Sequence, residues 1–490
     1  MEGSSTIPSV LSFALNQIQS VSVQAFQIQS STGSGSVNAN GSIRFNLPQT
    51  SIMDFHTSKV AFSVTCTGNG ARLPDYIENL FSGVRVTMGG VTVIQNNNLH
   101  GLLSTIQYET GEYEPDHVCG HTKCLDMQDA VGDNIQATNA IETYGTGAGL
   151  HSRLFSINLG ALRSFSPRLV DLSLLPAIQI ELIVAPLSVM MAVKTPTKVR
   201  GEAASIISDN GSSPSFTVDR PVLNANCYSM LSAGYSNSLR QRIADVGSLT
   251  FMYKQALAFQ TSWTGSNRFS VAANSIDKIS AVWRIKKNST TGMGFVPVAG
   301  RCSGTAIADC GGDGTTGANA QALTGERNYQ ATCNQMSIPL STPTPDDPTG
   351  TRGAGLEATG IFLDYSTQAA ALDFQFSINS AKYPQYQMGV GECYAMTCHA
   401  NNVSTLPNCK SIQEYMGNKF IVAVPLNLPT YKYDKPAVTG LSTLGSNSFS
   451  FFEVQSVGTG NDATNFDSIV FVHTTSLLKV GSGKQLEIIL

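Results

Sequence analysis

The most constraining feature of this 490-residue chain is a long series of short segments in which apolar and polar residues alternate. A period of two places one face of a strand against a core and the other toward solvent. Turn residues separate the segments, and no segment is followed by the long helix that a parallel βαβ unit requires. The pattern predicts an all-β protein built from sandwiches or barrels. The clearest segments are residues 43–47, 60–64, 84–94, 154–159, 178–184, 216–230, 249–253, 279–285, 372–378, 420–426, 448–454, 468–472 and 485–490.

The order of these segments predicts a duplicated architecture. Two series of about eight strands, separated by a helical stretch at residues 235–244, favour two tandem eight-stranded jelly-roll β-sandwiches with short helices and long loops. No sequence repeat relates the halves, so the duplication rests on element order alone. We expect an N-terminal arm at 1–41, a first jelly roll at 42–232, a helical joint at 233–246, and a second jelly roll at 247–490 that carries a large surface loop at 288–360.

Smaller elements refine this division. Residues 72–81, 98–107 and 390–398 are candidates for short helices, the second because its apolar residues recur at helical spacing. In the arm, residues 21–28 alternate and precede a Gly/Ser-rich run. That combination is typical of an exposed strand that pairs with a neighbouring subunit, and a disordered tail is an equally good interpretation.

The low charge content narrows the classes of molecule that the protein is expected to bind. Only 13% of residues are charged, the formal net charge is −4, and Glu2 is the single charge among the first 43 residues. We therefore expect no specific nucleic-acid binding and no basic arm for packaged genome. A surface poor in charge suits a protein that is covered by copies of itself. The apolar stretch at 10–15 is too short for a signal peptide, and the window at 177–193 reads as strand, so no membrane span is expected.

The strongest resemblance to a metal site is a cluster of Cys and His residues in the segment 116–124. Cys119, His121 and Cys124 are of types that bind zinc, but their spacing fits no standard structural array. We expect an ordinary exposed loop, and a zinc or disulfide role stays open as the alternative. Cys302, Cys310 and Cys333 lie in the large loop, where a disulfide is likewise an open alternative.

The other candidate sites favour structural interpretations. Cys393 and Cys398 fall on the apolar face of a predicted helix, with His399 and Cys409 nearby, and are expected to be core thiols. The glycine-rich segments 145–150 and 480–485 lack the spacing of nucleotide-binding loops and are expected to be turns. Trp263 and Trp283 are expected in the core. Four Asn-x-Ser/Thr matches, at Asn40, Asn210, Asn288 and Asn402, are explained by chance. With no G-x-S-x-G or H-E-x-x-H motif, we predict no catalytic, cofactor-binding or metal-binding residue and no cofactor.

Several segments in order resemble double jelly-roll major capsid proteins of dsDNA viruses, of the polinton-like virus and virophage type. In the first half these are residues 43–48, 53–58, 60–64, 73–77 and 84–94. In the second half they are residues 374–380, Tyr383-Pro384, the helix with Glu392 and Tyr394, and then residues 440–445, 469–472 and 477–480.

The resemblance implies a non-enzymatic major capsid protein that self-assembles. Three copies would form a homotrimeric, pseudo-hexameric capsomer that tiles an icosahedral shell, with penton and minor capsid proteins as further partners. The protein would be located in the virion after assembly inside the host cell. The alternatives are a carbohydrate-binding or carbohydrate-active β-sandwich protein, for which a secretion signal is missing, and a minor or vertex capsid protein, which differs in copy number.

Overall fold

The structure is a computed structural model. The residues that it describes are 21–33, 35–67, 71–72, 74, 76–96, 99–112, 154–189, 191–192, 215–230, 234–285, 336, 338–339, 373–378, 381–407, 409, 415, 419–428, 438–444, 451–457 and 466–489. The segment 116–124 and most of the predicted loop 288–360 lie outside these residues.

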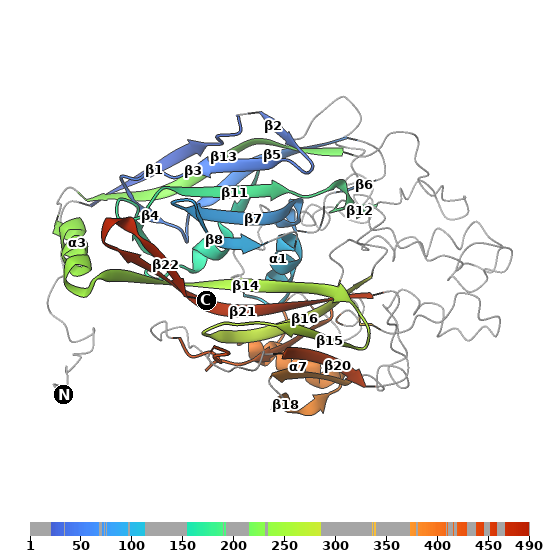
Figure 1. Cartoon of the computed structure of the whole chain (residues 1–490). Helices are drawn as coiled ribbons and strands as arrows, with labels where there is room; N and C mark the ends of the chain where they lie inside the picture. Colours follow the sequence, from blue (N-terminus) through green and yellow to red (C-terminus); the bar gives the residue numbers. More distant parts are fainter. Residues whose placement is uncertain are drawn as a thin grey trace, which may run out of the picture.

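Two antiparallel sheets form the first half of the molecule (Figure 1). The main strands of one sheet are, in spatial order, β1 (Val21–Gln29), β13 (Ser215–Met230), β5 (Lys59–Thr67) and β9 (Leu154–Asn158). The short strands β2 (Ser36–Asn38), β4 (Ile52–Asp54) and β10 (Leu169–Asp171) extend it. The opposing sheet contains β3 (Ser42–Asn46), β11 (Ile178–Val184), β7 (Phe81–Met88) and β8 (Val91–Asn96), and β6 (Ala71–Arg72) pairs with β12 (Met191–Ala192) beside it.

The second half is built in the same way. Its first sheet contains, in spatial order, β14 (Ser248–Ser262), β21 (Phe466–Gly481), β16 (Ile276–Ile285) and β19 (Ile421–Pro425), with the short β22 (Leu486–Ile489) added beside β21. Its second sheet contains β15 (Ser266–Ser270), β20 (Phe451–Val457), β17 (Asp373–Ile378) and β18 (Ala381–Met388).

The strand order is the same in both halves and defines a jelly roll. When the eight main strands of each half are numbered along the chain, one sheet has the order 1-8-3-6 and the other 2-7-4-5. This double-sheet arrangement is one of the ways in which antiparallel proteins close a sandwich. The prediction of an all-β fold with two eight-stranded jelly rolls is therefore confirmed.

The first strand of the first roll, β1, lies in the segment that the sequence assigned to the arm. Val21–Gln29 pairs along its whole length with β13 of the same chain. Its counterpart in the second roll is β14, which pairs with β21 in the same manner. The alternation that predicted a strand at residues 21–28 is thus realised within the chain, as strand 1 of the first roll.

In the part of the chain that the structure describes, the helical segments are few and short. Helix α1 (His100–Glu109) lies close to the predicted 98–107, α3 (Gly234–Val246) covers the predicted helical stretch 235–244, and α7 (Val390–Ala400) covers the predicted 390–398. The predicted helix at 72–81 is wrong, because only Ile77–Leu80 (η2) form a 3₁₀ turn and Phe81 already starts β7. Further 3₁₀ turns are η6 (Gly160–Ser164), η7 (Leu187–Val189) and η9 (Ser482–Lys484).

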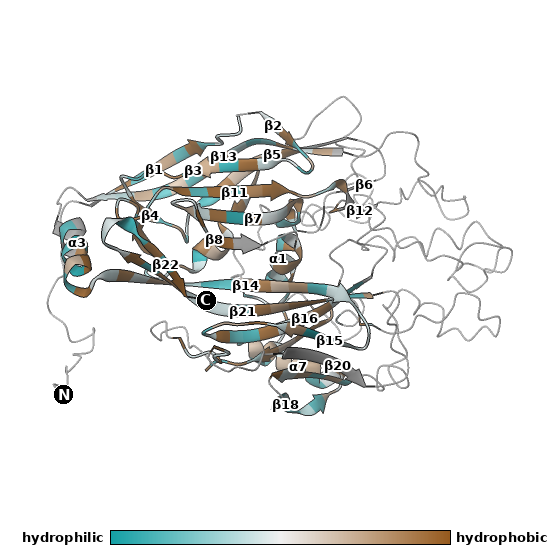
Figure 2. Ribbon diagram, in the orientation of Figure 1, coloured by the Kyte–Doolittle hydropathy of each residue, from teal (hydrophilic) through white to brown (hydrophobic). Residues whose placement is uncertain are grey.

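The rolls share one central layer. The 1-8-3-6 sheet of the second roll packs one face on its own core and presents the other to the first roll (Figure 1). In β21, Val470 and Val472 face the core of the second roll, whereas Ile469 and Phe471 contact α1 from the first half. Strands buried on both faces lose their alternation, and β16, β19 and β21 of this layer have no exposed residue among those described, whereas β14 alternates and shows both polar and apolar residues in Figure 2. At its other end Leu249, Phe251 and Tyr253 of β14 join the core of the first roll.

Candidate functional site

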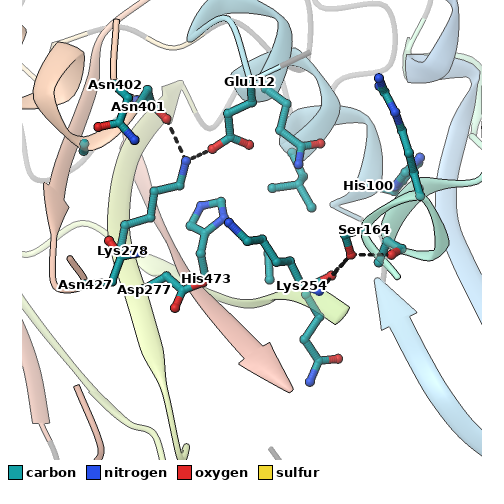
Figure 3. Close-up of a pocket in the computed structure, with 18 of the residues that line it drawn as sticks. His100, Glu112, Ser164, Lys254, Asp277, Lys278, Asn401, Asn402, Asn427 and His473 are labelled. Atoms are coloured by element: carbon teal, nitrogen blue, oxygen red, sulfur yellow. Dashed lines mark hydrogen bonds and ion pairs between the residues drawn. The ribbon is translucent and has the colours of Figure 1, made fainter. Parts of the chain in front are cut away.

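A polar pocket of about 450 Å³ lies where the two rolls meet (Figure 3). The first half lines it through α1, η6 and residue Glu112, and the second half through β14, β16, β21 and the residues that follow α7. The pocket exists because the apolar contact between the rolls, centred on Ile469 and Phe471, gives way to polar side chains at this point.

Lys278 of β16 contacts two polar side chains of the pocket. Its Nζ donates a hydrogen bond of 2.7 Å to Oδ1 of Asn401, the residue that caps the C-terminus of α7. The same Nζ forms an ion pair with the carboxylate of Glu112, which follows α1. Burial lowers the pKa of Lys278 to about 7. Burial thus favours the neutral amine, whereas the carboxylate of Glu112 favours the ammonium form.

His473 and Asp277 lie beside Lys278 on the same sheet. A ring nitrogen of His473 is 3.0 Å from Oγ of Ser280, and burial, together with the nearby Lys278 and Lys254, lowers the pKa of His473 well below its ordinary value. The carboxylate of Asp277 accepts a hydrogen bond of 2.6 Å from Thr475, and burial raises its pKa. Because its pKa is lowered, the imidazole of His473 is neutral at pH 7.

The opposite wall of the pocket fixes the first roll to the second. Oγ of Ser164 in η6 accepts a hydrogen bond of 2.7 Å from the backbone N–H of Lys254 in β14. Ser166 and Met252 add two backbone hydrogen bonds, of 2.8 and 3.1 Å, between the same segments. His100, at the start of α1, is buried, which lowers its pKa to about 4. Direct backbone contacts therefore hold the halves in a fixed relation.

The pocket does not have the layout of a hydrolase site. Ser280 and His473 resemble a nucleophile and its base, but Ser280 is only 1% exposed, so a substrate cannot reach it. The carboxylate of Asp277 accepts hydrogen bonds from the side chains of Thr475 and Ser275, whereas a catalytic triad needs an acid that orients the histidine. Among the described residues no group of three or more His, Cys, Asp or Glu side chains could hold a metal ion.

Several residues singled out in the sequence are core residues. Cys393 and Cys398 of α7 are buried, as predicted, and burial raises the pKa of both thiols. Trp263 and Trp283 are fully buried and form an edge-to-face pair with ring centroids 5.4 Å apart. The Gly-rich segment near Lys484 forms the turn η9, in which Gly483 has φ +74°, and leads into strand β22, as the interpretation as a turn requires.

Other candidates cannot be placed. The cluster of Cys119, His121 and Cys124, the loop cysteines Cys302, Cys310 and Cys333, and the segment 145–150 all lie outside the described residues. Of the four Asn-x-Ser/Thr matches, Asn40 and Asn402 are described, and both are exposed turn residues with positive φ.

Sequence reasoning missed the pocket and its contacts. Glu112, Lys278 and Asn401 are separated by more than a hundred residues in each step, and no local motif joins them. The one available signal was Lys278 itself, a lysine that adjoins the apolar segment predicted as a strand at 279–285.

An exposed surface is the second candidate for function. Nearly every described side chain of β1 is exposed, including Val23 at 69% and Phe26 at 41%. The strand pairs with β13 on one side only, and among the described strands none pairs with its outer edge. An apolar strand with an open edge is a typical site for association with another chain. No described helix is long and apolar enough to cross a bilayer.

Comparison with solved structures identifies the fold. The chain is similar to the PBCV-1 virus capsid, with a TM-score of 0.53 and 10% identity over 98% of this chain and 99% of that chain. It is similar to the Faustovirus major capsid protein, with a TM-score of 0.52 and 10% identity over 96% of this chain and 92% of that chain. No protein-family model and no curated protein sequence matches it. At this identity the likeness shows a shared fold, over nearly the whole length of both chains.

Proposed function

We propose that the chain is a major capsid protein that self-assembles as pseudo-hexameric homotrimers and tiles an icosahedral viral shell. The observation that carries the proposal is the presence of two jelly rolls of identical strand order in one chain. Three such chains around a threefold axis present six similar units, and a six-sided block can tile a surface. The fold shared with the PBCV-1 capsid and the Faustovirus major capsid protein supports this interpretation.

The surface chemistry fits a protein whose main partner is itself. Charged residues are few, the net charge is −4, and the open strand β1 exposes Val23 and Phe26. Obligate interfaces commonly bury more than about 2,000 Å² in total and are rich in apolar groups. We infer that the partners are further copies of the chain, within a trimer and between capsomers, together with penton and minor capsid proteins. No specific contact with nucleic acid is proposed.

The proposed role is structural, and the protein is proposed to reside in the virion after assembly in the host cell. It does not require an enzyme activity: in the pocket between the rolls, Ser280, which lies beside His473, is buried, and the carboxylate of Asp277 bonds Thr475 and not the histidine. A minor or vertex capsid protein would differ from the proposed major capsid protein in its copy number per particle.

Electron microscopy of purified particles, combined with quantitative protein composition, tests the proposal. We expect icosahedral particles covered by blocks with six-sided outlines, with this chain as the most abundant protein. A chain that is present in only a few copies per particle would be a minor component, and a chain that is absent from particles would contradict the proposal.

A further inference from the structure

Three side chains of the interface pocket form a contact that is unusual in chemical terms. A lysine amine, an asparagine side-chain amide and a glutamate carboxylate converge, because Nζ of Lys278 contacts both Asn401 and Glu112 (Figure 3). Each residue comes from a different element: strand β16, the C-terminus of α7 and the segment after α1. These are an amine nucleophile, an acyl group and an acid–base group in one place.

We propose that Lys278 and Asn401 form an isopeptide bond autocatalytically, with Glu112 as the residue that carries the proton. The bond would be a permanent cross-link between β16 and the end of α7. This modification is independent of the proposed shell role and needs no second protein, metal or oxidant.

The position of the amine suits attack on the amide carbon. Nζ of Lys278 lies 2.7 Å from Oδ1 of Asn401. Because a C=O bond is about 1.2 Å long, Cγ lies within about 3.9 Å of Nζ. Reactive geometries place the two atoms about 3–3.5 Å apart, so a small rotation of the lysine side chain is sufficient.

The amide is held in one orientation. Nδ2 of Asn401 donates a hydrogen bond of 2.7 Å to the backbone carbonyl of Thr397, which fixes Oδ1 and Cγ toward Lys278. Thr397 is itself anchored, because its hydroxyl bonds Ile421 O and the N–H of Ala423 in β19. The acyl group is therefore presented from a rigid helix end.

The nucleophile is supplied without a cofactor. The Lys278 side chain is only 12% exposed. Burial disfavours the ammonium form, and a lysine whose pKa is lowered in this way reacts through its neutral amine. The neighbouring His473 is neutral chiefly because burial lowers its pKa, so it adds no competing cation.

The reaction balances with one leaving group. The neutral amine of Lys278 attacks Cγ of Asn401, and a C–N bond forms between Nζ and Cγ. Glu112 takes a proton from Nζ and delivers it to Nδ2, the Cγ–Nδ2 bond breaks, and ammonia leaves. No atom changes oxidation state, and the chain ends lighter by one ammonia. Glu112 acts as general base and then as general acid from a position in contact with Nζ.

The origin of Glu112 couples the bond to folding. Lys278 and Asn401 belong to the second roll, whereas Glu112 comes from the first half, so the three groups meet only after the rolls have docked. The bond would close a covalent loop between positions 123 residues apart in the chain. It would thereby lock the second roll in its folded, docked form.

Mass spectrometry of the full, purified chain under denaturing conditions tests the proposal. We expect an intact mass lower than the sequence mass by one ammonia. Trypsin then cannot cut after Lys278, so the digest contains peptide 269–284 joined to peptide 383–410, with fragment ions that place the branch at Lys278 and Asn401. Linear peptides 269–278 and 279–284 in full yield would overturn the proposal. So would a loss of ammonia without the branched peptide, or a loss of water with Lys278 joined to Glu112.

Matched variants separate the chemistry from the fold. Lys278→Arg keeps the charge and removes the nucleophile, and Glu112→Gln keeps the shape and removes the proton carrier, so both should restore the unmodified mass. Lys254→Arg, at the other lysine of the pocket, is the control and should keep the ammonia loss and the branched peptide. Circular dichroism checks that each variant is folded. A Lys278→Arg chain that still lacks one ammonia would overturn the assignment.

Discussion

The two jelly rolls have the same strand order but differ in how their 1-8-3-6 sheets are covered. In the second roll the strands β21, β16 and β19 of this sheet are buried on both faces, by their own core and by the first roll. In the first roll the corresponding sheet ends in β1, whose side chains are almost all exposed. One topology thus serves two purposes. The second roll supplies the internal layer that joins the halves, and the first roll retains an open edge that other chains can use.

The largest loss of stability is expected from a substitution in the central layer. Phe471 in β21 is 1% exposed and packs between the rolls, so Phe471→Ala should lower the free energy of unfolding by about 3–5 kcal/mol. Chemical denaturation followed by fluorescence measures this loss. Because the rolls share this layer, both should unfold in one transition. Two separated transitions in the unmodified protein would break the comparison.

The carboxyl of Asp54 should make the folding stability of the first roll depend on pH in the acid range. Burial raises the pKa of this carboxyl, but hydrogen bonds from Arg168, Thr57 and His56 outweigh burial and lower the pKa below 3.8. Its contribution to stability is therefore present above the unfolded pKa and is lost as pH falls through the folded pKa.

The matching variant is Asp54→Asn. Because a hydrogen bond to a charged group is worth roughly 2 kcal/mol, the variant should lose about that much at pH 7 and show a flatter loss of stability below pH 4. Denaturation at several pH values measures both effects. Asp277 in the second roll has the opposite sign, since burial raises its pKa and its contribution is lost as pH rises through the folded pKa. Equal acid dependence of Asp54→Asn and the parent would contradict this account.

Substitution of Tyr253, which bridges the two rolls, should cause a smaller loss of stability. Its hydroxyl donates a hydrogen bond of 3.2 Å to the backbone carbonyl of Val93, from β14 of the second roll to β8 of the first. Tyr253→Phe removes this bond and leaves a buried carbonyl, so we expect a loss of about 1 kcal/mol. Thermal unfolding measures it, and Tyr228→Phe in β13 serves as a control on the first roll. An unchanged midpoint for Tyr253→Phe would show that the bond does not stabilise the interface.

The exposed strand predicts the smallest change in stability. Phe26→Ser in β1 removes an exposed apolar side chain and should alter the free energy of unfolding by less than about 0.5 kcal/mol. If β1 contacts other chains, the same variant should reduce the yield of assembled particles seen by sedimentation. Normal assembly by Phe26→Ser would remove β1 from the list of contact surfaces.

The same contrast explains what the sequence could predict. Strands with one buried face, such as β7 with its burial alternating around Val84 and Val86, were evident from alternation alone. The long strand β21 was predicted as a segment of about five residues, because burial on both faces masks the period of two. β14 was also predicted too short, although it alternates between buried and exposed residues over much of its length. β1 was assigned to an arm, because it buries little side-chain surface and is defined mainly by its backbone pairing with β13.

Residues of the candidate sites could be predicted only where the local sequence determines their burial. The burial of Cys393 and Trp283 could be predicted from apolar context. The contact of Lys278 with Glu112 and Asn401 could not, because it depends on how two rolls dock and on three segments that no local pattern connects.

The mass of the purified chain in solution tests the central claim most directly. Light scattering coupled to size-exclusion chromatography should give three times the chain mass of 52.0 kDa, because a capsomer with six jelly rolls requires three copies. The trimer should persist on dilution, as expected for a large obligate interface. A stable, folded monomer would contradict the account.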